Sequence, residues 1–272
     1  MSSLISPSDV EHFRQHGYTV VRGFATPDEV VAAAAAFETT MSRGAAGAFG
    51  KDYGEHTPGL MNATVPSLYT PLASLGGDGI FATLDVRARA VARALHGGAE
   101  LELDYEQLLR KLPNRGGAVF SPHQDQAYWP RSASGAFDTR TATISIAVNA
   151  ADESNGCLWV VPGTHAPRAL YPGDMTRKLD SRRDGGGVIE LAVRPDDLAR
   201  RVFLPLAPGD LTVHDEYLVH GSEGNGSPRS RDTLIFAYRM PSMIAFERSV
   251  GFRHSYADGE DVLRRVREHV WP

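Results

Sequence analysis

The sequence predicts a mainly β protein with flanking helices, whose core is a closed or double-sheet structure such as a barrel or jelly roll. From residue 101 onward, short β-rich runs alternate with turn sequences such as Asn155-Gly156 and Pro208-Gly209-Asp210, a pattern typical of antiparallel barrels and sandwiches. The chain has 272 residues, of which 42% are hydrophobic, and this is enough to enclose a sizeable core. The predicted strands are 101–112, 141–149, 157–161, 188–193, 201–204, 211–220 and 232–240.

Residues 1–100 are predicted to be mainly helical and to pack on the outside of the sheet. Two of the helices begin at N-caps, since Ser6 precedes Pro7 and Thr26 precedes Pro27, and proline is well suited to the first helical position. The predicted elements, in order, are a helix from Ser6 to Gly17, a strand over 18–24, a helix from Thr26 to about Met41, and a helix over 83–96 with one apolar face.

No repeat or linker divides the chain, so we expect a single domain over residues 1–272. Its expected parts are a helical flank at 1–100, a β core at 101–245 and a C-terminal tail at 246–272. Two segments, 43–66 and 172–187, have no regular pattern, and loops of this length are uncommon in compact domains unless they have a function. We expect one of them to close over a binding site, although the charged second segment also fits a solvated excursion.

The charge composition argues against a nucleic-acid partner. Lys and Arg number 28 against 33 Asp and Glu, which gives a formal net charge of −5 without any basic block. The longest apolar run is too short for a membrane helix of about 20 residues, and the first residues lack the features of a secretory signal. We therefore expect a cytoplasmic monomer or homodimer, not associated with membranes, whose partner is a small molecule.

The histidines and acids of the β region predict a metal site. Cys157 is the only cysteine, so any metal must be held by nitrogen and oxygen. His123 and Asp125 are two residues apart, and such side chains project from the same face of a strand. His220, at the end of the predicted strand 211–220, is the natural third ligand. Two imidazoles and one carboxylate suit Fe(II) and leave positions open for oxygen chemistry; hydrolytic zinc is the alternative.

A competing metal site lies on the same predicted strand as His220. His214 and Glu216 form a His-x-Glu pair, which with His254 or His269 would be able to hold its own metal. Alternatively, His214 and Glu216 support the ligands of the first site from behind.

Arg231 adds a cation to the predicted site. The stretch after His220 is rich in Gly, Ser, Asn and Pro and is expected to turn the chain back, so that Arg231 lies beside His220. A guanidinium there can pair with a carboxylate in a bidentate manner. This is the geometry needed to hold the far end of a dicarboxylic keto acid whose near end chelates iron. Arg229 has the same strand parity and is the alternative anchor.

Taken together, these motifs resemble the phytanoyl-CoA dioxygenase family of Fe(II)/2-oxoglutarate-dependent oxygenases. The resemblance runs through most of the chain, and the order and spacing of the motifs make it specific. It implies a double-stranded β-helix core of the jelly-roll, cupin-like type. The motifs are 16–24 (HGYTVVRGF), 122–126 (PHQDQ), 155–165 (NGCLWVVPGTH), 208–210 (PGD), and His220-Gly221-Ser222 with Arg231 eleven residues after His220.

The resemblance also implies roles for individual residues. Iron would be bound by His123, Asp125 and His220, and the distal carboxylate of 2-oxoglutarate by Arg231, which the eleven-residue spacing favours over Arg229. Further cosubstrate contacts are expected from two pairs that each share a strand face, Thr143 with Ser145 and Gln107 with Lys111; the alternative for Lys111 is a strand-edge residue with a solvated amine. Substrate contacts are expected from the segment after the metal motif, namely Gln126, Tyr128, Trp129 and Arg131, of which Tyr128 and Trp129 are alternatively core aromatics.

The expected activity is that of a dioxygenase that consumes 2-oxoglutarate and O₂ and hydroxylates an unactivated carbon of a small molecule, with release of succinate and CO₂. Asp125 favours oxygen transfer, because related halogenating enzymes lack this carboxylate; desaturation, epoxidation or ring closure would use the same residues. Function must be argued from the site rather than the fold, and a natural-product or amino-acid-like substrate is expected. The alternatives are a metal-dependent hydrolase or isomerase on a cupin-like barrel, in which Arg231 has no task, and a non-enzymatic binding barrel.

Overall fold

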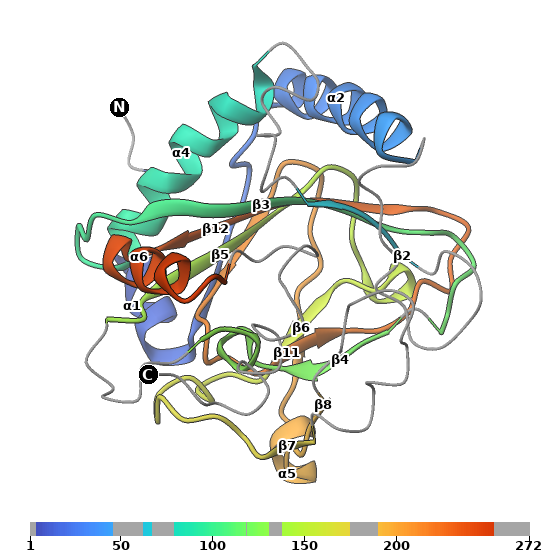
Figure 1. Cartoon of the computed structure of the whole chain (residues 1–272). Helices are drawn as coiled ribbons and strands as arrows, with labels where there is room; N and C mark the ends of the chain where they lie inside the picture. The colour runs from blue at the N-terminus through green and yellow to red at the C-terminus, as the bar shows by residue number, and fades with distance from the viewer. Residues whose placement is uncertain are drawn as a thin grey trace.

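Two antiparallel sheets face each other across the interior of the protein (Figure 1). The larger sheet has the strand order β1-β10-β5-β12-β3-β2 and the smaller one β4-β11-β6-β9, while β7 and β8 form a separate pair. The predicted mainly β, double-sheet fold with flanking helices is therefore confirmed. The computed structural model describes residues 4–45, 62–66, 79–117, 119–130, 138–174 and 190–252.

Each predicted strand and helix corresponds to an observed one, with ends that differ by a few residues, and one predicted strand is divided in two. The strands are β1 (Tyr18–Val21), β2 (Asn62–Pro66), β3 (Glu102–Lys111), β4 (Phe120–His123), β5 (Thr141–Ala147), β6 (Leu158–Val160), β7 (Gly173–Asp174), β8 (Glu190–Leu191), β9 (Val202–Phe203), β10 (Leu211–His214), β11 (His220–Ser222) and β12 (Arg231–Arg239). The helices are α1 (Pro7–His16), α2 (Pro27–Ala45), α4 (Ile80–Leu95), α5 (Pro195–Leu198) and α6 (Pro241–Ser249), with 3-10 turns at Asp125–Tyr128 and Glu153–Asn155.

The first helix begins where its capping residues predict. The backbone N–H of Asp9 donates to the Ser6 hydroxyl at 3.2 Å, and the Asp9 carboxylate accepts from the Ser6 backbone N–H at 2.7 Å. This reciprocal capping box satisfies two N–H groups that have no partner within the helix. It fixes the direction in which the chain enters α1, which packs beside β1 and α4.

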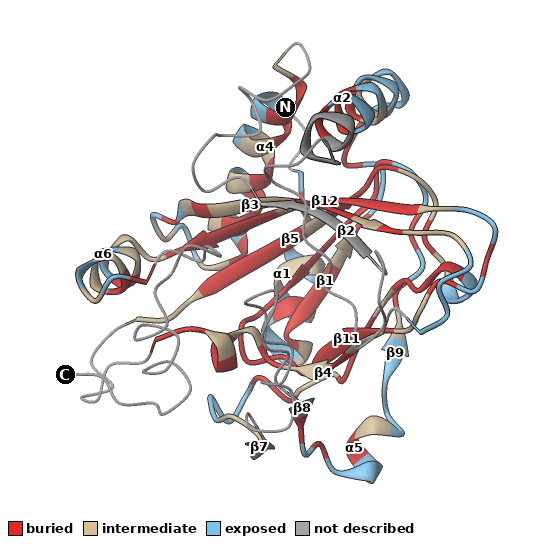
Figure 2. Ribbon diagram, turned by 45° about the vertical axis from the view of Figure 1, so that its right-hand side comes forward, coloured by how far each residue is buried: buried red, intermediate tan, exposed pale blue. Residues whose placement is uncertain are grey.

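The main apolar core lies between the helices and the outer face of the larger sheet, where Figure 2 shows buried residues on both layers. Phe37 of α2 and Leu84 of α4 pack in one cluster with Ile144 of β5 and Phe236 of β12, and all four are fully buried. Burying a side chain of this size contributes about 1.5–3 kcal/mol. The predicted apolar face of the 83–96 helix is confirmed, because its four members, Leu84, Ala88, Val91 and Leu95, are buried.

The inner face of the same sheet is polar. Thr143 and Ser145 alternate with the buried isoleucines of β5 and therefore point the other way, into the space between the two sheets. The registers place Thr143 beside His214 of β10, and Arg231 of β12 beside Lys111 of β3. A polar interior of this kind costs stability unless its groups are paired, and it is where the predicted site residues gather.

The strand predicted over 211–220 is wrong as a single element. β10 belongs to the larger sheet and β11 to the smaller one, so the chain crosses between sheets within this segment. The crossing is a turn in which the Asp215 carboxylate accepts the Tyr217 backbone N–H at 2.8 Å, and such Asx turns compete with strand pairing. His214 and His220 consequently come from opposite sheets instead of sharing one strand face.

Two further predictions need correction. The segment 43–66, expected to be an irregular loop, contains the end of α2 and the strand β2, which pairs with β3; 46–61 lies outside the described residues, as does 175–189 of the other long segment. Asp125 does not continue the strand of His123, because β4 ends at His123 and Asp125 opens a 3-10 turn.

The expected division of the chain into parts has a mixed outcome. Strands β1 and β2, from the mainly helical first hundred residues, belong to the same sheet as β5 and β12. This arrangement supports a single domain, and the domain count stays a prediction. Helix α6 crosses the expected boundary at residue 246, and the rest of the tail, 253–272, lies outside the described residues.

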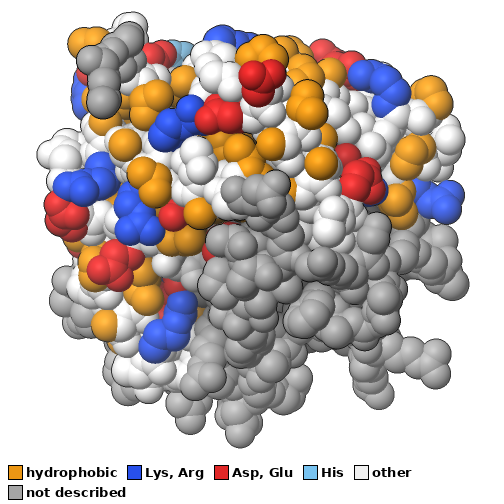
Figure 3. Space-filling model, turned by 90° about the horizontal axis from the view of Figure 1, so that it is seen from above, with side chains coloured by type: hydrophobic (Ala, Val, Ile, Leu, Met, Phe, Trp, Pro, Cys, Tyr) orange, Lys and Arg blue, Asp and Glu red, His pale blue; other side chains and the backbone are white. Residues whose placement is uncertain are grey.

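The outer surface over α2 and α4 carries both charges. Seen from above, acidic, basic and hydrophobic side chains are interspersed over the described part of this face (Figure 3). Val31 and Val86 are large apolar residues exposed here, at 70% and 68%. Among the described residues, none of the helices combines the length and the apolar character needed to cross a bilayer.

Candidate functional site

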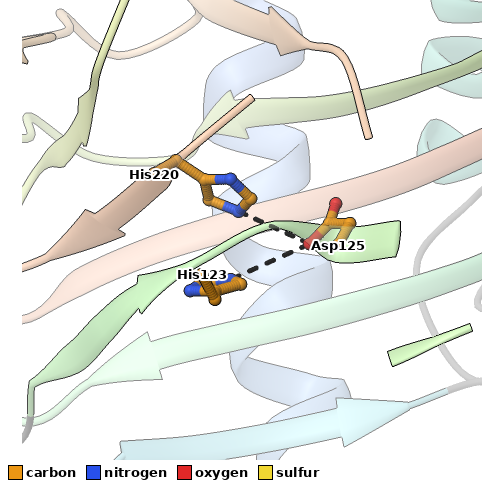
Figure 4. Close-up of side chains that lie close together, drawn as sticks. All are labelled: His123, Asp125 and His220. Carbon is orange, nitrogen blue, oxygen red and sulfur yellow. Dashed lines mark ion pairs between the residues drawn. The ribbon is translucent and has the colours of Figure 1, made fainter. Parts of the chain in front are cut away.

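Three predicted metal ligands meet between the two sheets (Figure 4). His123 ends β4 and His220 begins β11, and the two residues are direct partners in the register of this strand pair. The Oδ1 atom of Asp125 lies 3.8 Å from Nε2 of His123 and 3.4 Å from Nε2 of His220. Each residue offers a ligand atom within 4.8 Å of the other two, which is close enough for one cation to contact all three.

Both imidazoles present the nitrogen that a metal needs. Nδ1 of His123 lies 2.8 Å from the Ser121 carbonyl, and Nδ1 of His220 lies 2.8 Å from the Leu218 carbonyl. Because a carbonyl only accepts, the proton is on Nδ1 in each ring, and the lone pair of Nε2 faces Asp125. Burial and the neighbouring His220 lower the pKa of His123 to about 3, so this ring is neutral at physiological pH.

The carboxylate of Asp125 is held in its charged form. Burial raises its pKa, but the surrounding imidazoles outweigh burial and hold the pKa well below the usual range. Its second oxygen, Oδ2, accepts a hydrogen bond from the Thr143 hydroxyl at 3.0 Å and lies 3.3 Å from Nε2 of His214. Although burial opposes it, the charge of Asp125 raises the pKa of His220 in turn. Two imidazole nitrogens and one carboxylate oxygen are the donor set that suits a divalent transition metal such as Fe(II).

The competing metal pair of His214 and Glu216 does not form in the structure. His214 reaches Asp125, whereas the Glu216 carboxylate accepts from Arg168, from the Thr139 hydroxyl and from the Thr141 backbone N–H. These donors are distant from Glu216 in the sequence. Both carboxylate oxygens of Glu216 therefore already accept hydrogen bonds. The two histidines proposed to complete that site, 254 and 269, lie outside the described residues.

Gln124, between the two ligands of the metal motif, has a structural role that the sequence analysis missed. Its side-chain amide donates to the Tyr217 carbonyl at 2.6 Å and to the Ala169 carbonyl at 3.1 Å, and accepts the Tyr171 backbone N–H at 2.8 Å. Gln124 is fully buried. It therefore fastens the metal motif to two other segments of the chain. Sequence spacing gives no signal for this, because the three partners are backbone groups.

Two basic side chains lie side by side on β12 and β3 of the larger sheet. Arg231 and Lys111 are partners across β12 and β3, and both are buried. Nη1 of Arg231 donates to the Gly156 carbonyl, its Nε has no hydrogen-bond partner, and it forms no ion pair with any residue that the structure describes. Burial lowers the pKa of Arg231 to about 10. A buried guanidinium of this kind is costly unless an anion joins it.

Lys111 is not the solvated strand-edge residue that was the alternative. It lies in a strand with neighbours on both sides, and its amine donates to the Glu223 carbonyl at 2.8 Å. Burial, together with the charge of Arg231, lowers its pKa well below the usual value. The side chain is buried because β2, which the sequence analysis did not predict, covers this edge of β3.

Gly156 allows the chain to approach these cations closely. Its φ is +77°, and a Cβ atom would lie 2.2 Å from the Glu223 carbonyl oxygen and 3.1 Å from Cδ of Lys111. No other residue fits without displacing backbone. The Asn-Gly turn before β6 therefore brings its carbonyl to Arg231.

Other predicted cosubstrate residues have distinct surroundings. Arg229 forms an ion pair with Asp152 at 2.6 Å, and its side chain keeps 49% exposure, so of the two arginines only Arg231 lies in the interior. Gln107 and Ser145 are half-buried and lie in one row of the larger sheet, since each is the partner of Ile235.

Ser222 is a further buried polar residue of β11, which the sequence analysis did not assign to the site. It lies two positions after His220 on β11 and is buried. Residues i and i+2 of a strand project from the same face, and this spacing is the signal that would have found it.

The predicted substrate residues next to Asp125 differ in their surroundings. Gln126 is fully buried, and neither its amide nitrogen nor its amide oxygen has a hydrogen-bond partner. Tyr128 is half-buried, and its ring lies edge-on to His123 with 5.7 Å between the ring centroids. Both therefore remain candidates for substrate contact.

Trp129 packs as a core aromatic. It is 4% exposed and shares a cluster with Phe252, and the guanidinium of Arg239 lies over its ring at 4.1 Å. Its faces are thus covered by protein. Arg131 lies outside the described residues.

The fold and the site together define a cupin-like protein with a candidate metal site of two histidines and one aspartate. Comparison with known sequences assigns the chain within this class. Residues 13–233 match phytanoyl-CoA dioxygenase (PhyH), and the chain belongs to this family.

Individual relatives are more distant. The chain is 31% identical over 154 residues to phytanoyl-CoA dioxygenase domain-containing protein 1 of Bos taurus, which covers 55% of this chain and 48% of that protein, so the chain spans about half the length of such curated relatives. It is 26% identical over 241 residues to the ectoine dioxygenase of Stutzerimonas stutzeri (strain A1501), covering 84% and 75%. Among solved structures, the non-haem α-ketoglutarate-dependent carbocyclase SnoK from nogalamycin biosynthesis superposes with a TM-score of 0.67 at 25% identity, covering 87% of this chain and 84% of SnoK.

Proposed function

We propose that the protein is an Fe(II)/2-oxoglutarate-dependent dioxygenase that hydroxylates a carbon of a small molecule. The observation that carries this proposal is the presence of two opposite features, one where β4 and β11 of the smaller sheet pair and one on β12 of the larger sheet. Asp125 and two imidazoles offer a site for a cation, and Arg231 offers a buried charge for an anion. A dicarboxylic keto acid has a chelating end for the first feature and a carboxylate for the second.

Fe(II) with bound 2-oxoglutarate supplies the oxygen chemistry, in which substrate, O₂ and 2-oxoglutarate give hydroxylated substrate, succinate and CO₂. His123, Asp125 and His220 hold the metal. Arg231 and Lys111 bind the distal carboxylate, and Ser222, Ser145 and Gln107 are further polar groups of the same interior. Thr143 acts on Asp125 instead of on the cosubstrate, because its hydroxyl donates to Oδ2.

For the substrate we propose a small natural product or an amino-acid-like molecule. A relative is an ectoine dioxygenase and a structural neighbour is a carbocyclase of nogalamycin biosynthesis, and these names support the proposal. The unpartnered amide of Gln126 supports a substrate that offers a donor and an acceptor of its own. Tyr128, beside His123, is the aromatic residue that we place against it.

A hydrolase or isomerase on the same barrel would need the metal but not Arg231. Succinate release separates the two functions. The metal-free protein is supplied anaerobically with Fe(II), 2-oxoglutarate and a panel of amino acids, ectoine-like compounds and aromatic polyketides, and succinate is measured with and without O₂.

Succinate that requires both Fe(II) and O₂ is the expected result, and its rate rises with a substrate. Absence of O₂-dependent succinate across the panel would refute the proposal. Binding of 2-oxoglutarate to the Mn²⁺-loaded protein, followed by calorimetry, tests the cosubstrate site without turnover. Arg229→Gln serves as the control for Arg231→Gln in that measurement.

A further inference from the structure

The outer oxygen of Asp125 is engaged by two donors, one from β5 and one from β10. Oδ1 faces His123 and His220, while Oδ2 accepts from the Thr143 hydroxyl at 3.0 Å and from Nε2 of His214 at 3.3 Å. We propose that Thr143 and His214 form a clamp on Oδ2 that keeps Asp125 a one-oxygen ligand, so that a metal position stays open for O₂. This inference rests on the metal site of the proposed function.

A carboxylate can bind a cation through one oxygen or through both. To bind through both, Asp125 would have to turn Oδ2 toward the metal, and this turn breaks two hydrogen bonds at once. Each hydrogen bond to a charged group contributes more than one between neutral groups. The clamp therefore favours the one-oxygen mode over the chelating mode.

The two donors are fixed before any metal arrives. Thr143 of β5 and His214 of β10 are direct partners in the register of adjacent strands, so the sheet itself sets the distance between them. Both strands are held from behind by the apolar core, through Ile144 and Val213. A pair of donors on a packed sheet has little freedom to follow a moving carboxylate.

The protonation of His214 suits this role. Its Nε2 faces a carboxylate oxygen, and its Nδ1 is buried without a hydrogen-bond partner. The tautomer with the proton on Nε2 is the one that makes the available hydrogen bond. The His214 ring also lies against the His220 ring, with 4.2 Å between the centroids, so it contacts two of the three ligand residues.

The open position has a direct consequence for the number of bound waters. Three protein ligands would leave positions open on a bound metal, and a chelating keto acid would fill two of them. In a Mn²⁺ complex with 2-oxoglutarate, one exchangeable water would then be expected at the position that is left. If Asp125 chelates through both oxygens, that water is displaced and the position for O₂ is lost.

The test is the water-proton relaxation of Mn²⁺-loaded protein with 2-oxoglutarate, which reports metal-bound water without turnover. Thr143→Val keeps the shape of the side chain and removes the hydroxyl, and His214→Phe keeps a ring and removes the donor. His214→Gln places an amide N–H near the position of Nε2 and is expected to restore the clamp. Thr212→Val is the matched control, because Thr212 is fully buried two positions before His214 on β10 and its hydroxyl has no partner.

We expect the bound-water signal to fall from one water to none in Thr143→Val and His214→Phe, and to stay at one in His214→Gln and Thr212→Val. Retention of the water in folded Thr143→Val would overturn the clamp, and so would loss of Mn²⁺ binding by that variant. If His214→Phe does not fold, Thr143→Val decides alone. Failure of the wild-type protein to bind Mn²⁺ or 2-oxoglutarate would instead overturn the proposed function.

Discussion

The charged groups at the two parts of the interior site, Asp125 and Arg231, differ in how far their charges are already paired. At the metal end, the Asp125 side chain keeps 13% exposure, and both of its oxygens already have neighbours, namely imidazoles and a hydroxyl. At the other end, Arg231 is buried with a single backbone carbonyl as partner and with Nε unpaired. The first end is organised before its ligand arrives, and the second is completed by its ligand.

This difference has an energetic reason. A carboxylate that accepts hydrogen bonds is stable in the charged form. The hydrogen bonds to Asp125 therefore stabilise its charged form before a metal binds. A buried guanidinium that lacks an anion costs several kcal/mol, which is recovered when a carboxylate binds. An asymmetric keto acid is consequently bound in one orientation only.

The largest effect is expected from removing a metal ligand. His123→Ala should lower metal affinity by about 10³-fold, because each ligand contributes on the order of 4 kcal/mol. Calorimetry with Mn²⁺ and the iron content of the purified protein measure it. His12→Ala on α1 is the control, with unchanged affinity. Full iron content in His123→Ala would contradict the assignment of ligands.

The next effect tests how tightly the cationic end is built. Gly156→Ala should reduce the free energy of unfolding by about 3 kcal/mol, since the new Cβ overlaps backbone and also sits at a positive φ. Gly163 has a similar φ of +82° with nothing within 4 Å of its Cβ position, so Gly163→Ala should lose only about 1 kcal/mol. Urea denaturation measures both; equal losses would show that the close approach at Gly156 has no energetic role.

Replacing the buried cation should weaken cosubstrate binding. Arg231→Gln is expected to raise KM for 2-oxoglutarate by about 10- to 100-fold, the range for losing charge-assisted hydrogen bonds of about 1.5–3 kcal/mol. It should also abolish the rise in Tm that 2-oxoglutarate causes in the Mn²⁺-loaded protein. Arg229→Gln should change KM less than about twofold, because exposed ion pairs contribute little. The reverse order would identify Arg229 as the anchor.

The smallest expected effect is the uptake of a proton by Lys111 when 2-oxoglutarate binds. Burial and the charge of Arg231 lower the pKa of Lys111 in the ligand-free protein, so a carboxylate bound beside it raises that pKa and the amine takes up a proton. Below the lowered pKa no proton is taken up, and between the two values uptake approaches one. Calorimetric titration of 2-oxoglutarate in two buffers of different ionisation enthalpy, repeated at several pH values, should show proton uptake that begins above the lowered pKa of Lys111. Lys111→Met should abolish it, and identical heats in both buffers for the native chain would contradict the expectation.

The sequence alone determined the features that depend on local spacing. Short β-rich runs separated by turn residues predicted the strands, and Ser6 before Pro7 predicted the start of α1, because both depend on neighbours within a few residues. The pairing of His123 with Asp125 and the position of Arg231 followed from the same kind of pattern and from a family resemblance. Sequence spacing does not show whether they meet, since that depends on contacts about a hundred residues apart.

Only the tertiary structure decided which polar groups face one another. The division of 211–220 into two strands placed His214 behind Asp125, and the pairing of β2 with β3 buried Lys111. The sequence analysis gave Gln124 no role. In the structure its side chain forms hydrogen bonds with backbone groups from elsewhere in the chain. Burial and hydrogen bonding depend on which groups lie close together in space. The periodicity of residues along one strand therefore does not predict them.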